Sequence, residues 1–186
     1  MEAVAQTTIA IDLLTPLVEG TRPEQLGDPT PCEAWTVGDL IGHFVMGGHL
    51  FAASLRGAEI SGGEPPADVL GDDHVAAYLA AIADFQDAVS HLDSLEKPAQ
   101  LPFGTVPADI ALRIAAGDLL VHGWDLSQAT GQGFQPPEDV VGEIEGFYRV
   151  AIGPELRAGG SFGEPVEISP DAAPLERLVA FAGRQP

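Results

Sequence analysis

The stretch from Thr105 to Thr130 constrains the fold most, because its apolar residues recur at helical spacing along its whole length. Thr105 is a good helix cap, Pro107 suits a first turn, and Gly131 is typical of the position after a helix end. At 1.5 Å per residue, the predicted helix is roughly 38 Å long. No other stretch of the chain has so strong a helical pattern.

Five further segments repeat the apolar period of about 3.6 residues that is typical of amphipathic helices. Gly20 ends the first, and Thr36 with Asp39 forms a capping box at the start of the second. Four main helices of similar length predict an all-α fold, a helical bundle. Val166 to Ile168 is either a short strand or an extended segment. The further helices are predicted at 3–19, 37–55, 74–92, 138–152 and 174–183, with connections at 57–73 and 93–104.

Three glycines, Gly42, Gly47 and Gly48, interrupt the second predicted helix. Each costs about 1 kcal/mol relative to alanine in a helix interior. They are expected either to permit close helix packing or to leave room for a ligand beside His43.

The acidic balance restricts the classes of partner. The 186 residues include 8 Lys and Arg against 28 Asp and Glu, a formal net charge of −20. Such a charge repels phosphate backbones and anionic membrane surfaces, so neither nucleic acid nor membrane is an expected partner. The length suits one domain, with a bundle core over 1–131 and a C-terminal extension over 132–186, as a monomer or homodimer.

The predicted compartment is the cytoplasm. Cys32 is the only cysteine, so no internal disulfide forms, as is usual in a reducing compartment. Glu2 and Asp12 precede the first basic residue, Arg22, which is unlike a secretory signal peptide. No apolar run approaches the roughly 20 residues that a membrane-spanning helix needs.

Asp118 and His122 are the most informative pair for function. A spacing of four residues puts both side chains on one helix face, one turn apart, where they can hold a divalent metal ion. His43, on the second predicted helix, is the third candidate donor, and we expect the three to converge on one metal. A catalytic zinc commonly has three protein ligands and one open position. Zinc is the expected metal, with nickel, iron or manganese as alternatives.

A structural role is the competing interpretation. Asp118 and His122 would then share an intrahelical hydrogen bond, and His43 would be a satisfied core residue. Asp39 also precedes His43 by four residues, so a dinuclear centre is conceivable, but a capping role explains Asp39 more simply. Asp125 either orients the imidazole of His122 or forms an ion pair.

The other reactive side chains are given structural roles. Trp35 and Trp124 are expected to be walls of the core or of a pocket. Cys32 is expected to pack, although a helix start nearby would lower a thiol pKa. The remaining histidines are expected to be solvated, namely His49, His74 and His91.

Three segments resemble the mycothiol-dependent maleylpyruvate isomerase metal-binding family, which belongs to the DinB-like four-helix bundles. They are Thr30–Cys32, Trp35–His43 and Asp118–Leu126, and the tail over 173–184 is similar to small actinobacterial members. The resemblance spans nearly the whole chain and implies an up-and-down bundle. It also implies a metal at the positions of His43, Asp118 and His122, and a mycothiol- or bacillithiol-like cofactor whose sulfur binds that metal as a nucleophile.

Two departures from that family concern the position or affinity of the metal, for the first, and the substrate, for the second. The isomerase has Glu where this chain has the shorter Asp118. It also carries a sizeable second domain, whereas only about 55 residues follow Gly131 here. A substrate-binding group from such a domain would be missing, which argues against maleylpyruvate.

The leading functional hypothesis is a metal-dependent isomerase or S-transferase that uses a mycothiol-type thiol on a small electrophile. The alternative is a metal- or ligand-binding bundle without turnover, and a third possibility is a bundle with structural histidines. Bound metal in untagged protein separates the first two from the third. Thiol-dependent turnover separates the first from the second.

Overall fold

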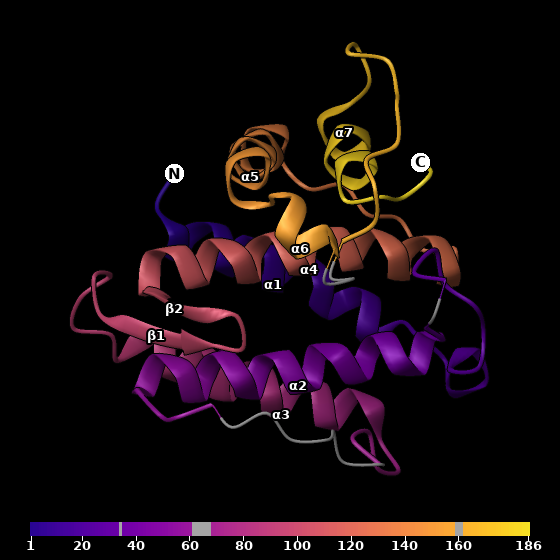
Figure 1. Cartoon of the computed structure of the whole chain (residues 1–186). Coiled ribbons are helices and arrows are strands. Elements are labelled where there is room, and N and C mark those ends of the chain that lie inside the picture. Colours follow the sequence, from indigo (N-terminus) through magenta and orange to yellow (C-terminus); the bar gives the residue numbers. More distant parts are fainter. Residues whose placement is uncertain (34, 61–67, 159–161) are drawn as a thin grey trace.

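The computed structural model describes residues 1–33, 35–60, 68–158 and 162–186. Its centre is an up-and-down bundle of four helices (Figure 1). Helix α1 packs on α4, α2 packs on α3, and α2 faces α4, which confirms the predicted all-α bundle. The bundle helices are α1 (Ala3–Glu19), α2 (Val37–Arg56), α3 (His74–Ser90) and α4 (Ala108–Thr130). The other elements are η1 (Pro23–Gln25), β1 (Pro98–Leu101), β2 (Gly104–Pro107), α5 (Glu138–Ala151), α6 (Pro154–Ala158) and α7 (Pro174–Phe181).

Helix ends follow the local chemistry of the chain. The Thr36 hydroxyl accepts from the Asp39 N–H at 3.2 Å, and the Asp39 carboxylate accepts from the Thr36 N–H at 2.9 Å. This capping box starts α2 and confirms the capping role of Asp39. Gly57 and Gly131 end α2 and α4 with left-handed φ angles of 86° and 72°. Among the helices of the described ranges, none combines the length and apolarity needed to cross a membrane.

An antiparallel hairpin of β1 and β2 replaces part of the predicted connection before α4. Thr105 pairs with Gln100 in this hairpin, so the prediction that Thr105 caps α4 is wrong; Pro107 precedes the helix instead. Ala99 and Leu101 alternate with exposed neighbours, which is too short a pattern to indicate a strand in the sequence. The hairpin lies at one end of the bundle, beside α2 and α4 (Figure 1).

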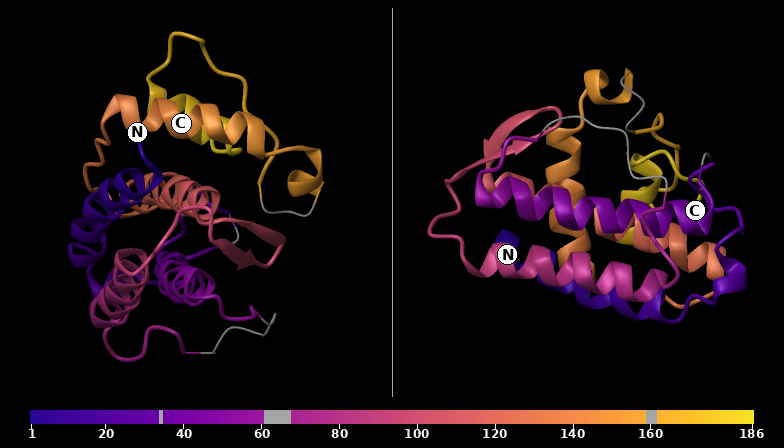
Figure 2. Two further views of the ribbon diagram at one scale, coloured as in Figure 1. Left: turned by 90° about the vertical axis from the view of Figure 1, so that its left-hand side faces the viewer. Right: turned by 90° about the horizontal axis from the view of Figure 1, so that it is seen from below.

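The C-terminal extension covers α4. Helices α5 and α7 pack on each other and cross α4 (Figures 1 and 2). Gly117 of α4 permits this approach, because a Cβ there would lie 2.3 Å from the ring of Tyr148 on α5. The Val166 region is extended rather than a strand, with its N–H donating to the carbonyl of Ala180 at 2.9 Å. The short helix α6 was not among the predicted elements.

The glycines of α2 have both predicted uses, at different positions. A Cβ on Gly48 would lie 3.0 Å from the Ala81 carbonyl, so Gly48 allows α2 and α3 to pack closely. Gly42 and Gly47 face open space, and Gly47 lines the cavity beside His43.

Candidate metal centre

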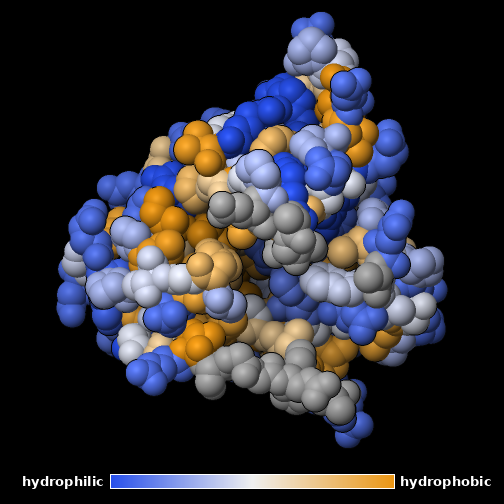
Figure 3. Space-filling view, in the orientation of Figure 1, coloured by the Kyte–Doolittle hydropathy of each residue, from blue (hydrophilic) through white to orange (hydrophobic). Residues whose placement is uncertain are grey.

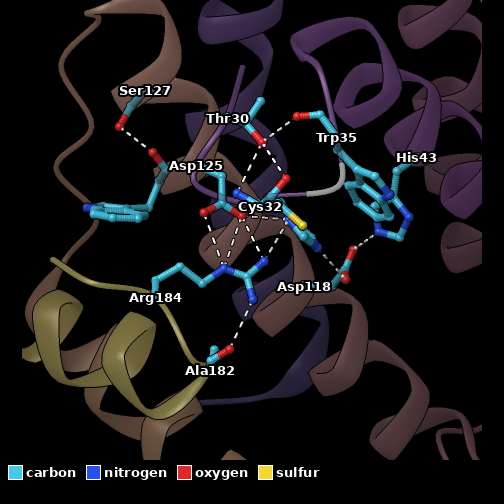
Figure 4. Close-up of polar contacts among 11 residues, drawn as sticks. Thr30, Cys32, Trp35, His43, Asp118, Asp125, Ser127, Ala182 and Arg184 are labelled. Atoms are coloured by element: carbon cyan, nitrogen blue, oxygen red, sulfur yellow. Dashed lines mark hydrogen bonds and ion pairs between the residues drawn. The ribbon is translucent and has the colours of Figure 1, made fainter. Parts of the chain in front are cut away.

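The three predicted donors meet where α2 faces α4, and Figure 4 shows two of them, His43 and Asp118, directed at each other. His43 Nε2 lies 3.0 Å from Asp118 Oδ2, and His122 Nε2 lies 3.7 Å from Asp118 Oδ1. One donor atom from each of the three residues lies within 4.8 Å of the other two. Two imidazole nitrogens and one carboxylate oxygen suit a divalent metal ion such as zinc. The residues present therefore fit a single cation.

The electrostatics of the cluster favour a charged carboxylate. Burial alone would raise the pKa of Asp118, but the charges of His43, His122 and Arg184 and the His43 hydrogen bond outweigh it and lower that pKa to about 2. Burial opposes the charged form of His43, but the adjacent Asp118 carboxylate prevails and raises the pKa of the imidazole. Asp118 is therefore an ionised donor at any physiological pH.

Asp125 supports the cluster from behind. Its Oδ2 lies 2.8 Å from Nδ1 of His122, and the Asp125 side chain is fully buried. A carboxylate at Nδ1 holds the imidazole so that Nε2 is presented to Asp118 and His43. Of the two interpretations of Asp125, the orienting role matches this contact, and the ion pair exists as well.

The ion-pair partner is Arg184, which follows α7 in the C-terminal tail. Its Nη2 donates to Asp125 Oδ2 at 2.9 Å, and its Nη1 donates to the carbonyl of Ala182 at 3.0 Å (Figure 4). Burial would raise the pKa of Asp125, but hydrogen bonds from His122 and Arg184 lower it overall. Arg184 is not among the site residues predicted from the sequence, where its only signal is that it is one of 8 basic residues in an acidic chain.

The loop before α2 brings Cys32 and Trp35 to the same place. The Thr30 hydroxyl accepts from the Cys32 N–H at 3.1 Å, and the Trp35 N–H donates to the Cys32 carbonyl at 2.8 Å. The Cys32 sulfur shares a second group of close donor atoms with His122 and Asp125. Burial raises the pKa of the Cys32 thiol, which Arg184 only partly opposes. A nearby helix start would lower the pKa of this thiol, but burial raises it instead. The half-buried thiol packs in the wall of the cavity.

Aromatic walls flank the donors as predicted. The Trp35 ring lies 4.8 Å from the His43 ring and 5.3 Å from the His122 ring, centroid to centroid.

His49 and His91 are exposed, as expected. His74 is buried, and its Nε2 lies 3.1 Å from the Thr21 carbonyl, so the prediction that His74 is solvated is wrong. The first residue of a helix is often exposed, but the loop after α1 packs on the His74 side chain through Thr21.

A cavity of about 1050 Å³ opens beside the donors. Figure 3 shows the face of the molecule that is hollowed there, with hydrophobic side chains gathered on one side of the hollow. The wall combines the donor cluster with residues of α2, the hairpin, α4 and the tail. Its polar or reactive members are Thr30, Cys32, Glu33, His43, Asp118, His122, Tyr148, Arg184 and Gln185.

Residues 8–127 match the family model described as the mycothiol maleylpyruvate isomerase N-terminal domain. The chain belongs to this family. Two Mycobacterium tuberculosis proteins, named Uncharacterized protein MT0763 and Uncharacterized protein Rv0738, are each 34% identical to it over 176 residues. Each alignment covers 94% of this chain and 93% of the relative, so the likeness includes the extension.

A crystal structure of the mycothiol-dependent maleylpyruvate isomerase shares the fold, with a TM-score of 0.59 at 17% identity. It covers 76% of this chain and 67% of that one. A variant of the isomerase with one histidine replaced by alanine matches with the same TM-score at 14% identity. The family model ends at residue 127, so Arg184 reaches the donor cluster from outside the matched family domain.

Proposed function

We propose that the protein binds one divalent cation through His43, Asp118 and His122 and uses a mycothiol-type thiol on a small electrophile, as an isomerase or S-transferase. The observation that carries the proposal is the convergence of three donors, from two helices, on the wall of one cavity. At about 1050 Å³, the cavity has the size of a site for small molecules. Membership in a mycothiol isomerase family supports a thiol as the cofactor.

Each residue has a defined part in such a site. A zinc ion held there would stabilise the sulfur of a small thiol in its anionic, nucleophilic form. Asp125 holds the tautomer of His122, and Trp35 packs against both imidazoles, so the donors keep their positions. His43 and Asp118 are 30% and 33% exposed in their side chains, which leaves their donor atoms accessible from the cavity.

The proposal also covers the organisation of the chain. We propose that the bundle core, 1–131, and the extension, 132–186, form a single metal-binding domain. The pair between Arg184 and Asp125 supports this, because the extension then supplies a buried partner to the carboxylate that orients His122. A small-molecule thiol and substrate are the partners that such a site requires, and a reducing cytoplasm would keep the thiol in its active form.

Metal content tests the donor set directly. Protein purified without a His-tag, and the His43→Ala and His122→Ala variants, would be analysed for metals by mass spectrometry, with helical content checked by circular dichroism. We expect about one zinc per wild-type chain and loss of that zinc in both variants. His49→Ala is the matched control, since His49 lies on α2 but pairs with Asp84 on the surface. Unchanged metal in His122→Ala would refute the donor set.

Turnover tests the catalytic part of the proposal. The zinc-loaded protein would be mixed with mycothiol and a small electrophile, and the rate compared with the reaction without protein. We expect acceleration that a chelator removes and added zinc restores. No acceleration with mycothiol or bacillithiol, in protein that holds zinc, would leave a metal-binding bundle without this chemistry.

A further inference from the structure

We infer that the cavity takes an uncharged electrophile that carries an apolar group, and disfavours carboxylates. The inference rests on the proposed function and names the substrate class of that same site. Two observations carry it, which are the apolar wall of the cavity that the donors also line and the balance of charge around the donors.

The apolar wall comes from three parts of the fold. Helix α2, the hairpin and α4 each contribute large aliphatic or aromatic side chains, and one more comes from the segment between α6 and α7. Phe103 is 58% exposed and lines the cavity, so its ring is available to contact a ligand. An apolar ligand that covers this surface removes it from water and therefore gains affinity here. These wall residues are Leu50, Phe51, Leu101, Phe103, Ile114 and Phe162.

The charged groups of the described wall do not favour an anion. They are Glu33, Asp118 and Arg184, and Asp125 lies directly behind Arg184. One carboxylate offsets the arginine and two remain, so a divalent cation would only bring the wall to neutrality. A thiolate on that cation would make the wall negative again. A substrate carboxylate would therefore meet no net attraction.

Arg184 is not a free carboxylate clamp. Proteins recognise carboxylates through the two-pronged donor face of a guanidinium, and Arg184 directs that face at Asp125. Its side chain is only 10% exposed, and Nη1 donates to the Ala182 carbonyl. To bind a substrate carboxylate, Arg184 would have to break its ion pair with Asp125 and leave that buried carboxylate unpaired, which is costly.

A matched pair of unreactive ligands tests the inference by binding alone. N-phenylsuccinimide and its 4-carboxyphenyl analogue differ by one carboxylate and lack a reactive double bond. Calorimetry on the full zinc-loaded chain at low salt should show the neutral ligand binding at least about 10-fold more tightly, a difference of about 1.4 kcal/mol. Higher salt should narrow the gap by screening. Equal or tighter binding of the carboxylate, or binding of neither ligand, would overturn the inference.

A charge placed on the apolar wall should change the preference. Phe103→Lys puts a cation at an exposed position of the hairpin turn, and Phe103→Leu is the apolar control. In Phe103→Lys, we expect the affinities for the neutral ligand and the carboxylate to lie within about 2-fold of each other. In Phe103→Leu, we expect the difference between these affinities to stay as in the wild type. Leu50→Lys repeats the test from α2. An unchanged gap in both lysine variants would show that the ligand does not contact this wall.

The inference and the proposed function fail in different experiments. If the protein prefers the uncharged ligand but shows no thiol-dependent turnover, the inferred ligand class stands and the proposed catalytic function fails. Thiol-dependent turnover with a preference for carboxylates would do the reverse.

Discussion

The donor cluster and the pair behind it contrast sharply in exposure. His43 and Asp118 are 30% and 33% exposed in their side chains, and they face a cavity. Asp125 and Arg184 are 0% and 10% exposed, and they are bonded to each other. Groups that must exchange ligands need solvent access, whereas groups that fix an orientation function best when they cannot exchange partners. The same imidazole, His122, connects the two sets.

The strongest way to break the contrast is to remove the buried cation. Arg184→Met leaves the Asp125 carboxylate buried without its arginine partner, while the hydrogen bond to His122 remains. We expect a loss of about 3–5 kcal/mol in the free energy of unfolding, because an uncompensated buried charge is costly. Urea unfolding of the metal-free protein measures it. Adding Asp125→Asn to the same chain should recover part of the loss.

Arg56→Met is the control for that experiment. Arg56 also bridges acidic residues, Asp84 and Asp87, but on the surface between α2 and α3. Its removal should barely shift the urea midpoint, since exposed pairs contribute little. If Arg184→Met and Arg56→Met lower the free energy of unfolding equally, the buried pair of Arg184 and Asp125 does not stabilise the protein more than a surface pair does.

Asp125→Asn alone sharpens the contrast through the metal. The amide keeps the shape of the carboxylate but makes His122 a weaker donor. Zinc affinity should fall by roughly 10- to 100-fold, as is common when the hydrogen-bond partner of a metal-binding histidine is changed. Competition with a chelator of known zinc affinity measures it. Asp39→Asn is the matched control, since Asp39 caps α2 and should not affect zinc; a large loss there would revive the dinuclear alternative.

The donors could be predicted from the sequence because they lie on regular helices. A spacing of four residues fixes Asp118 and His122 on one face whatever the rest of the chain does. The bundle, and the start of α2 at Thr36, follow from periodicity and capping in the same way.

The remainder depends on tertiary contacts that no local pattern encodes. Arg184 reaches Asp125 across 59 residues, so neither position signals the other. Thr105 looks like a cap by composition, yet pairing with Gln100 places it in a strand. Cys32 and His74 were assigned from their positions beside helix starts, whereas the loops that bury them determine their environments.

Acid titration addresses the front of the site. Asp118 has a pKa of about 2 in the folded protein, below its ordinary value of about 3.9. A lowered carboxyl pKa stabilises the fold above the ordinary value, and this stabilisation is lost as pH falls from about 4 towards 2. At pH 5, the free energy of unfolding of the metal-free wild type should exceed that of Asp118→Asn by about 1–2 kcal/mol. This figure is smaller than the full pKa shift would give, because the Asp118 side chain is one-third exposed and solvent screens its charge. Urea unfolding at pH 5, 4 and 3 should show the difference shrinking; a constant difference would contradict the ion-pair arrangement.

Cys32 gives the smallest expected effect, and it lies between the two sets of residues. Burial raises the pKa of its thiol above the ordinary value of about 8.5, while the charge of Arg184 pulls the other way. In metal-free protein, iodoacetamide should therefore modify Cys32 several-fold more slowly than a free thiol at pH 7.5, and the rate should still be rising above pH 8.5. Arg184→Met should slow the reaction further, because the positive charge that favours the thiolate is gone. Mass spectrometry reads the reaction cleanly, since the chain has 1 cysteine. A rate that levels off below pH 8 would mean that the thiol senses the arginine more than its burial, and that the wall between the two sets is more polar than its contacts indicate.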